Sequence, residues 1–406
     1  MMAAISSAPR GAQVAILDQL DRPGVKLLTT GGGRCNVTNM LDKSSFMERF
    51  GKSGRFIQPA LNAMSEPTLR AFLAKHGVPT VSPDHFHVYP ASNSSASVLH
   101  ALWELCTRRN VKQCLGTEAK LLLIENGFVT GIDTSSGRFA ARSVILATGG
   151  KSYPDLGATG SGYTLAASAG HTITTPLPVL VPLVTRETWP GELSGVSLRQ
   201  VHVRIDLPRR QKARCTGDML FTRTGISGPA ILDLSRDVVP LLQEHGDVPI
   251  RINLQPEISA EQWNARFDEW QSAHGRKKVL KLLGQHLPAS LARVILRLAG
   301  MAEDVPAAAF SRPQREAVLE LITRLPLAVK SSGGFDNAMV TRGGVSLREV
   351  DPKTLQSRKV CGLYFAGEIL DLDGPCGGYN LQWAFSSGWL AGSSAACEFA
   401  NKGGMQ

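Results

Sequence analysis

The segment Thr29–Asn39, TTGGGRCNVTN, has the composition of a loop that binds a diphosphate. Gly31, Gly32 and Gly33 have no Cβ atom to hold a ligand away, so their backbone N–H groups can line one concavity. Arg34 adds a fixed positive charge directly after them. The alternative is a glycine-rich surface loop without a ligand, because short glycine motifs also occur by chance.

A short apolar run precedes this loop and ends in an acid. The run Val14–Asp18 predicts a buried parallel strand, because it is apolar up to its last residue. In a dinucleotide-binding unit, an acid at the end of such a strand accepts hydrogen bonds from a pair of ribose hydroxyls. Asp18 is therefore a candidate ribose ligand.

Another apolar strand is predicted at 144–150, VILATGG, and it ends in small residues. At Thr148, Gly149 and Gly150, small side chains let the backbone approach a ligand closely. The loop that follows leads into a helix at Tyr163. This segment is a second candidate for contact with the same ligand.

A third strand is predicted near the carboxyl end, where Gly362–Glu368 finishes in a glycine and an acid. Gly377–Asn380 then leads into a long predicted helix from Leu381, whose first turn presents free N–H groups and partial positive charge. Small residues recur every four positions along this helix, a stripe that allows close packing: Ala384, Gly388, Gly392 and Ala396.

With KLLTTGGGRCNVTN preceded by Pro23 and Gly24, the chain resembles the BaiN/RdsA family of FAD-dependent oxidoreductases, the YhiN-type flavoproteins. Further matching blocks are LATGGKSYPDLGATGSGYTLA, LVPL, LFTRTGISGPAILDLS, VTRGGVSLREVDPKTL and GLYFAGEILDLDGPCGGYNLQWAFSSGWLAG. Several long blocks in the family's order are more specific than any single glycine motif. The resemblance implies an α/β fold: a Rossmann-like FAD-binding domain of the glutathione-reductase type, with an inserted β-barrel-like and helical substrate domain.

The resemblance also implies the positions of FAD contacts. The backbone near Glu118 and Ala119 is expected beside the adenine, and Glu368 is expected to bind ribityl hydroxyls or a pyrophosphate-bound water. The helix after Asn380 is expected to face the flavin's pyrimidine edge, where negative charge grows on reduction. Tyr379 and Asn380 are candidates for contact with the isoalloxazine or substrate. The predicted cofactor-binding residues are Asp18, Lys26, Gly31, Gly32, Gly33, Arg34, Ala119, Thr148, Gly149, Gly150, Gly367, Glu368, Gly378, Tyr379 and Asn380; no metal ligand and no catalytic residue is assigned.

The sequence departs from the family pattern at three places. A Rossmann unit opens with a strand and a glycine-rich turn before its first helix, but residues 1–10 already resemble that helix. We therefore expect a truncated chain, or one begun at an internal methionine, with weakened FAD binding, because the absent turn places a helix N-terminus at the pyrophosphate. Ser161 stands where the family usually has an acid, and Arg223 where it commonly has a histidine.

The predicted secondary structure changes character along the chain. Short strands at 119–124, 127–134 and 137–141 predict a small antiparallel meander. Alternating apolar positions at 201–205 and 249–254 predict further antiparallel strands. We predict a first part of the FAD-binding domain at 1–175 (N-terminally incomplete), an inserted substrate domain at 176–342 (β-rich 176–255, helical 256–325) and the second part of the FAD-binding domain at 343–406.

The inserted helical part carries two local signals. Capping-box spacings begin at Ser259 and Ser311, each followed three residues later by glutamine. Trp263, Phe267 and Trp270 fall on one helical face. We interpret this aromatic stripe as core packing, because such stripes are more often core than cofactor sites.

The bulk composition fits a globular protein of two or three domains, with 406 residues, 43% hydrophobic and 19% charged. No apolar run approaches the roughly 20 residues of a membrane span, and the first residues lack a secretion-signal pattern. Seven cysteines, an odd number without a close CxxC pair, favour a reducing compartment. We expect a cytoplasmic protein without a membrane partner.

The net charge of +10 raises the question of a nucleic-acid partner. The basic clusters Arg209–Arg214 and Arg276–Lys278 are not interleaved with aromatic residues as in a stacking platform. We interpret them as solvated faces that help attract an anionic cofactor or substrate, and we do not expect a nucleic-acid partner.

Two reactive residue types have competing interpretations. Cys35 could be redox-active, because Arg34 and the glycine loop could lower its pKa, but a packing role is favoured. Cys376 is a weaker candidate, and a pair between the two cysteines stays open. His85 and His87 could ligate a metal from one strand face, but we find no cysteine or carboxylate to complete the set, so a structural or substrate-pocket role is favoured.

We predict an FAD-dependent oxidoreductase acting on a small organic substrate. Flavin supplies the redox chemistry, so no catalytic triad is needed, and no spacing predicts one. The resemblance implies NAD(P)H as a transient electron donor, and either reduction of unsaturated steroid-like substrates or oxidation of amino ketones. Two alternatives stay open: a flavoprotein that modifies RNA, and a non-enzyme, either a truncated remnant that does not retain FAD or a flavin-containing binding protein.

Overall fold

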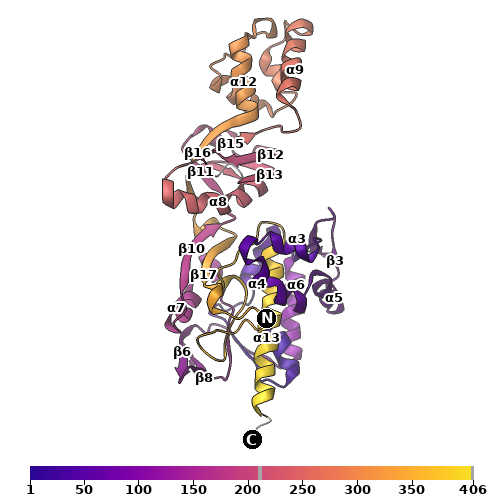
Figure 1. The fold of residues 1–406 in the computed structure, drawn as a ribbon. Coiled ribbons are helices and arrows are strands. Elements are labelled where there is room, and N and C mark those ends of the chain that lie inside the picture. The colour runs from indigo at the N-terminus through magenta and orange to yellow at the C-terminus, as the bar shows by residue number, and fades with distance from the viewer. Residues whose placement is uncertain (209–212, 404–406) are drawn as a thin grey trace. The chain divides into compact units, whose positions relative to one another are not determined.

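The computed structural model describes residues 1–208 and 213–403 (Figure 1). The chain forms two compact units, one made of Met1–Pro178 with Met339–Gln406 and the other of Val179–Ala338. The basic residues 209–212 lie outside the described residues. Within the described part of the chain, no helix is both long enough and apolar enough to cross a bilayer.

The first unit contains two pairs of short parallel strands. β1 (Ala15–Leu17) pairs with β5 (Lys112–Cys114), and β9 (Val144–Leu146) pairs with β18 (Leu363–Phe365). Each predicted strand at these positions is confirmed but is shorter than its apolar run. β9 and β18 come from distant parts of the chain. Parallel pairing allows this, because parallel strands are joined by crossover connections and not by tight turns. The loops after β1, β9 and β18 carry the predicted ligand contacts.

Helices and two antiparallel sheets surround these strands. β6 (Ala119–Glu125), β7 (Phe128–Thr134) and β8 (Gly137–Ala140) form the predicted meander. A smaller sheet has the order β2 (Thr38–Asn39), β4 (His87–Pro90), β3 (Thr80–Val81). The main helices of this unit are α1 (Met2–Ser7), α2 (Val25–Thr29), α3 (Lys43–Glu48), α4 (Gly54–Ala63), α5 (Glu66–Lys75), α6 (Ser95–Arg108), α7 (Ser161–Ser168) and α13 (Tyr379–Gly403).

The small-residue stripe of α13 allows α1 to lie against it. A Cβ atom added at Gly392 would lie 2.1 Å from the Ala3 carbonyl oxygen, and one at Gly388 would lie 3.1 Å from Met2 Cβ. Ser7 Oγ donates a hydrogen bond of 2.9 Å to the Gly392 carbonyl. The predicted structural role of the stripe is confirmed at these two glycines.

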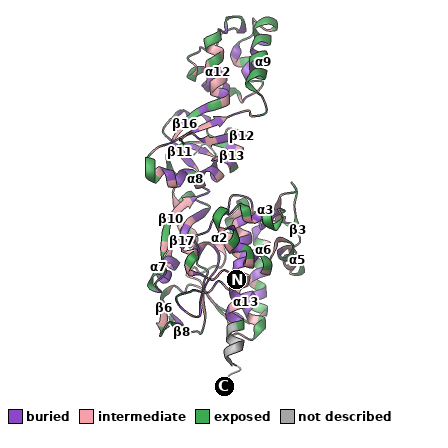
Figure 2. Cartoon of the chain, viewed as in Figure 1, coloured by how far each residue is buried: buried purple, intermediate pink, exposed green. Residues whose placement is uncertain are grey.

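The second unit is a closed six-stranded barrel with a helical part. The strand order is β11 (Leu183–Thr185), β14 (Gly225–Ser227), β13 (Arg214–Thr222), β12 (Ser197–Ile205), β15 (Val248–Asn253) and β16 (Leu325–Ser332). Closure leaves no exposed sheet edge. Figure 2 shows buried residues along these strands and on α8 (Pro229–His245). The α/β class and the barrel are thus confirmed.

The helical part consists of α9 (Ala260–Ala273), α10 (Val279–Leu283), α11 (Ala289–Leu298) and α12 (Arg312–Arg324). Both predicted capping boxes, at Ser259 and Ser311, are present. Trp263, Phe267 and Trp270 are buried in one cluster with the barrel residues, which confirms their core role.

Candidate cofactor-binding site

A cavity of about 930 Å³ lies in the first unit, lined by residues of β1 and β9, one strand from each parallel pair. This volume falls within the roughly 300–1,000 Å³ of small-molecule and cofactor sites. Five of the predicted contacts line it: Asp18, Lys26, Ala119, Thr148 and Gly149. Ser161 also lines it, so its replacement of an acid affects the cavity wall directly.

Asp18 is oriented by backbone bonds at the end of β1. Its N–H donates to the Cys114 carbonyl at 3.0 Å, and its carbonyl accepts from the Thr117 N–H at 2.8 Å. Its carboxylate oxygen Oδ1 accepts from the Leu20 N–H at 3.0 Å. The carboxylate is half-buried and holds a fixed direction at the cavity wall, as a ribose ligand requires.

Lys26 and Glu368 form an ion pair across the site, with Lys26 Nζ 2.8 Å from Glu368 Oε2. Lys26 comes from α2, and Glu368 comes from the turn Gly367–Ile369 that follows β18. The second carboxylate oxygen, Oε1, accepts from the Thr341 N–H at 2.8 Å. The structure thus brings together two predicted contacts that lie 342 positions apart.

The glycines after β9 are required by close packing. A Cβ at Gly150 would lie 2.4 Å from Thr341 Oγ1 and 2.8 Å from Glu368 Oε1. Gly149 has a φ of 75°, a conformation that favours glycine. The backbone of this loop therefore lies directly against the Glu368 carboxylate, with no side chain between them.

The triple-glycine loop follows α2 and lies beyond the cavity wall. Gly31, Gly32 and Gly33 have φ values of 57°, 65° and 86°. Successive backbone N–H groups in such conformations can form an anion-binding concavity. The Arg34 guanidinium stacks on Tyr89, with its carbon 4.7 Å from the ring centroid, and its Nε donates to the Gly31 carbonyl at 3.3 Å. Arg34 thus stabilises this loop, in addition to supplying the positive charge predicted for a diphosphate.

The two glycine loops of the first unit contact each other through β2. A Cβ at Gly378 would lie 2.5 Å from the Thr38 carbonyl oxygen, and Asn39 Nδ2 donates to the Gly377 carbonyl at 2.8 Å. Gly367 is fixed from α13, because its carbonyl accepts from Trp383 Nε1 at 3.1 Å. Segments from both ends of the chain therefore contact each other here, although neither loop lines the cavity.

The side chains of Tyr379 and Asn380 contact other residues of the protein. Asn380 Oδ1 accepts from the Gly374 N–H at 2.8 Å, and its Nδ2 donates to the Gly374 carbonyl at 2.9 Å. The Tyr379 ring is buried and packs 4.9 Å from Phe46, centroid to centroid. These contacts give both residues a role in holding the loop before α13, and a contact with flavin or substrate stays a prediction.

The cysteine contacts favour packing over redox chemistry. Burial raises the pKa of the Cys35 thiol to about 11, although a hydrogen bond with Thr30 opposes this. Among the described residues no cysteine forms a disulfide, so the predicted alternative of a Cys35–Cys376 pair is not present. A thiol with a raised pKa is a poor nucleophile at neutral pH.

The two histidines near residue 86 do not share a strand face. His85 lies in a turn with a φ of 59°, and β4 begins only at His87. The expectation that no carboxylate lies near these histidines is wrong, because the Asp84 carboxylate lies 2.5 Å from His87 Nδ1. Across residues 1–208 and 213–403, no group of three possible ligands for a metal ion is found. The pair Asp84–His87 stabilises the turn.

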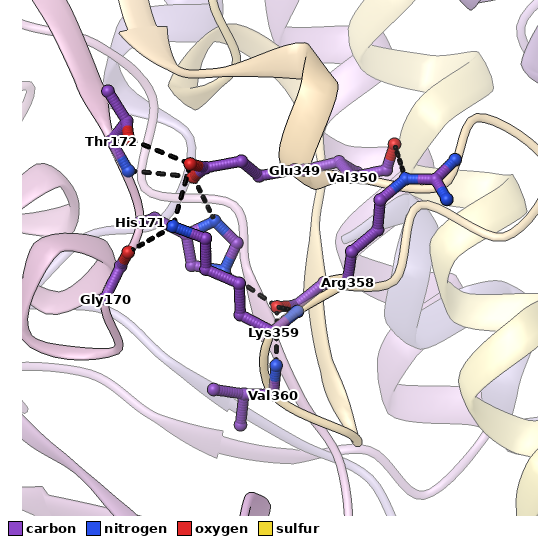
Figure 3. Close-up of polar contacts among 9 residues, drawn as sticks. Gly170, His171, Thr172, Glu349, Val350, Arg358, Lys359 and Val360 are labelled. Atoms are coloured by element: carbon purple, nitrogen blue, oxygen red, sulfur yellow. Dashed lines mark hydrogen bonds and ion pairs between the residues drawn. The ribbon is translucent and has the colours of Figure 1, made fainter.

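A buried Ser–His–Glu cluster was not predicted from the sequence (Figure 3). His171 Nε2 lies 2.7 Å from Ser357 Oγ, and His171 Nδ1 lies 3.2 Å from Glu349 Oε2. Glu349 also accepts from Thr172 and pairs with Lys359 at 2.7 Å. No short-range spacing in the sequence indicates this arrangement, because 186 positions separate His171 from Ser357.

The arrangement resembles a hydrolytic triad but lacks an accessible nucleophile. The His171 side chain is fully buried, and Ser357 is 7% exposed. Ser357 Oγ accepts from the backbone N–H groups of Lys359 and Val360 at 3.0 and 2.9 Å, so its lone pairs are occupied. The cluster therefore ties together three segments of the first unit and is not a catalytic centre.

Comparison with known proteins identifies the family of the chain. A family profile described as HI0933-like protein Rossmann domain matches residues 1–394. The chain is 37% identical over 400 residues to a 3-dehydro-bile acid delta(4,6)-reductase of Clostridium scindens, covering 98% of this chain and 96% of the relative. It is 30% identical over 384 residues to a ribosomal RNA dihydrouridine synthase of Escherichia coli K12, covering 93% and 91%.

Solved structures show the same fold at low identity. A 3-ketosteroid-delta4-(5alpha)-dehydrogenase from Rhodococcus jostii RHA1 has a TM-score of 0.51 at 16% identity, covering 97% of this chain and 94% of that one. The E. coli quinol fumarate reductase has a TM-score of 0.51 at 14% identity, covering 99% and 69%. With its Rossmann-type FAD-binding fold and its inserted barrel, the chain belongs to the HI0933-like Rossmann-domain family, as the sequence blocks predicted.

Proposed function

We propose that this protein is an FAD-dependent oxidoreductase that reduces a carbon–carbon double bond conjugated to a carbonyl group in a small organic substrate. The observation that carries the proposal is the cavity of about 930 Å³ lined by Asp18, Lys26 and Thr148, with Glu368 paired to Lys26. The family relationship supplies the reaction class. NAD(P)H is proposed as the electron donor.

The residues present fit a dinucleotide. The Asp18 carboxylate offers Oδ2 for ribose hydroxyls, because Oδ1 already accepts from Leu20. The Lys26 ammonium supplies positive charge for a diphosphate, and Glu368 holds it in place. When bound, FAD supplies the hydride chemistry, and the protein supplies orientation and exclusion of water.

The relatives' names support one reaction class. A 3-dehydro-bile acid with delta(4,6) double bonds carries those bonds in conjugation with its 3-oxo group. Dihydrouridine is uridine whose ring double bond, conjugated to a carbonyl, has been reduced. Both names therefore describe addition of two hydrogen atoms across a carbon–carbon double bond conjugated to a carbonyl group. We propose the same addition here.

We propose that the second unit binds the substrate and that the electron donor binds only transiently. The barrel and helices of Val179–Ala338 are proposed as the substrate domain, with Arg223, exposed in the turn between β13 and β14, as a specificity position. The sequence contains no GxGxxG that would mark a separate nicotinamide-binding domain, so NAD(P)H is proposed to approach transiently. Seven cysteines without a disulfide among the described ones support a cytoplasmic location.

Reduction of uridine in RNA is the second candidate, favoured by the 30% identity to the ribosomal RNA dihydrouridine synthase. We rank it below a small substrate because the identity to the bile acid reductase is higher, at 37%. The net charge of +10 suits an anionic substrate of either size.

The test uses the purified full chain incubated with FAD, desalted and examined by visible absorption. The expected result is a flavin spectrum that is bleached anaerobically by NADH or NADPH and recovers on addition of a 3-oxo-4,6-diene bile acid. A saturated 3-oxo bile acid serves as the matched control and should leave the flavin reduced. A chain that binds no flavin contradicts the proposal. A chain whose flavin recovers only with ribosomal RNA, with dihydrouridine formed, establishes the second candidate.

A further inference from the structure

The buried residue Thr341 connects two segments of the candidate site. It lies on β17 (Val340–Val345), close after the point where the chain returns to the first unit at Met339. Its side chain is fully buried, and it was not among the predicted site residues. It reaches the loop after β9 with its side chain and the turn after β18 with its backbone.

The backbone N–H of Thr341 fixes the carboxylate of Glu368. This N–H donates to Glu368 Oε1 at 2.8 Å, while Lys26 Nζ binds Oε2 at 2.8 Å. With one oxygen held by the backbone, the other is directed at Lys26. The position of β17 thus sets the direction of the ion pair.

The Thr341 hydroxyl fixes the loop that contains Gly150. Thr341 Oγ1 accepts from the Lys151 N–H at 2.8 Å and lies 2.8 Å from Ser152 Oγ, which is also fully buried. A hydroxyl has one donor and two acceptor positions, so it can satisfy both partners. Removing it deletes the acceptor of this Lys151 N–H bond and the partner of Ser152 Oγ, so two hydrogen bonds of the site are lost.

Gly150, Thr341 and Glu368 are tightly packed against one another. A Cβ at Gly150 would lie 2.6 Å from Thr341 Cβ and 2.8 Å from Glu368 Oε1. A small displacement of Thr341 therefore moves either the Gly149–Gly150 backbone or the Glu368 carboxylate. Both are predicted to contact FAD.

We propose that Thr341 is a positioning residue of the cofactor site. Through its hydroxyl and its N–H it sets the separation between the Gly149–Gly150 backbone and the Lys26–Glu368 ion pair, without contacting the cofactor itself. The inference rests on the proposed function for its consequence, which is the affinity and redox potential of bound FAD.

Two variants and a matched control test this role in the full chain. Thr341→Val keeps the shape and removes Oγ1, whereas Thr341→Ser keeps the hydroxyl. Thr185→Val is the control, because Thr185 is equally buried and donates to the Glu187 carbonyl at 2.9 Å, but belongs to the second unit. The measurements are FAD affinity, the midpoint potential of bound FAD, and hydrogen exchange of residues 149–152 in the FAD-free protein.

Thr341→Val is expected to weaken FAD binding by about tenfold, as expected for a lost buried hydrogen bond, and to shift the midpoint potential. It should also speed exchange of the Lys151 amide. Thr341→Ser should restore wild-type values, and Thr185→Val should leave all three unchanged. Wild-type affinity and potential in Thr341→Val overturn the inference. A wild-type chain without FAD affinity contradicts the proposed function instead, and unchanged Lys151 exchange in Thr341→Val then overturns the positioning role as well.

Discussion

Asp18 accepts a hydrogen bond from the Leu20 N–H with one carboxylate oxygen, and the residue lines the cavity. Asp18→Asn keeps the shape and an oxygen for the Leu20 N–H but removes the charge. We expect FAD affinity to fall about tenfold or more, because hydrogen bonds to charged groups contribute roughly 1.5–3 kcal/mol. Equilibrium dialysis measures the affinity.

FMN provides the control for this variant, because it lacks the adenosine ribose that Asp18 is proposed to bind. FMN affinity should be equal in the wild type and in Asp18→Asn. Equal losses for both flavins would show that the variant damages the site as a whole.

Gly162 is required by a side chain rather than by its backbone angles. A Cβ there would lie 1.9 Å from Thr148 Oγ1. We expect Gly162→Ala to lower the free energy of unfolding by about 1–3 kcal/mol through overpacking. Urea denaturation measures this loss.

The double variant Gly162→Ala with Thr148→Ala tests the assigned contact. Removing the Thr148 hydroxyl should recover part of the loss, because contacting residues are coupled. Strictly additive losses would place the strain elsewhere.

Single residues differ in how readily the sequence predicts them. The place of Asp18 after β1 could be predicted, because an acid after an apolar strand is a local signal, while its role as a ribose ligand stays a prediction. The Lys26–Glu368 pair could not be found from spacing, since 342 positions separate its members. Thr341 is one threonine among many, and only the packing around Gly150 reveals its role.

The contact between α1 and α13 predicts unequal effects for two equivalent substitutions. Gly392→Ala places a Cβ 2.1 Å from the Ala3 carbonyl oxygen, whereas Gly388→Ala places one 3.1 Å from Met2 Cβ. Alanine gains about 1 kcal/mol of helix propensity over glycine at either position. We expect Gly392→Ala to destabilise by about 1–3 kcal/mol because of the clash, and Gly388→Ala to be nearly neutral. Thermal denaturation of both variants checks the order.

The His171 cluster predicts lower stability in acid. Burial lowers the pKa of His171, although Glu349 opposes this. Burial also acts to raise the pKa of Glu349, but hydrogen bonds from Lys359 and Thr172 outweigh it and hold that pKa at about 2. The Lys359 ammonium also acts to lower the pKa of His171, and the Phe365 ring packs against the imidazole with the two ring centroids 4.8 Å apart.

Both shifts give the same direction. The unfolded His171 takes up a proton near its ordinary pKa of about 6.5, and the folded residue only at lower pH, so its contribution is complete above about pH 6.5 and is lost below it. Glu349 adds a further loss from about pH 4.5 toward pH 2. The melting temperature should therefore fall between pH 7.5 and pH 5.5. In His171→Gln it should start lower and change less over this interval; an equally steep fall would assign the titration to another group.

Elements were predicted well where their pattern is local. The capping box at Ser259 and the strands of the meander follow from short-range spacing. The closure of the barrel did not follow, because it depends on the pairing of β11 with both β14 and β16, which join distant segments. The contact between Ser357 and His171 could not be predicted either, because 186 positions separate the two residues.

The whole molecule carries a net charge of +10, which predicts salt-sensitive capture of an anionic substrate. For a substrate with a carboxylate, kcat/KM should fall about three- to tenfold between low salt and ~0.3 M salt, where charges are screened beyond several ångströms. An uncharged ester of the same substrate should show little change. Equal salt dependence for both would remove the role of net charge.

The distribution of the site over the chain also constrains the order in which the protein can be completed during synthesis. The barrel and its helices form from the contiguous stretch Val179–Ala338, which can fold while the ribosome is still elongating. The ion pair at the cofactor site cannot form until Glu368 has emerged, and α13 follows it. The amino-terminal residues of the site are therefore synthesised long before their partners, and their apolar side chains stay exposed until those partners emerge. A nascent chain arrested before Glu368 would contain a folded barrel and an incomplete flavin site. We expect chaperones to bind the apolar surface that such a chain exposes.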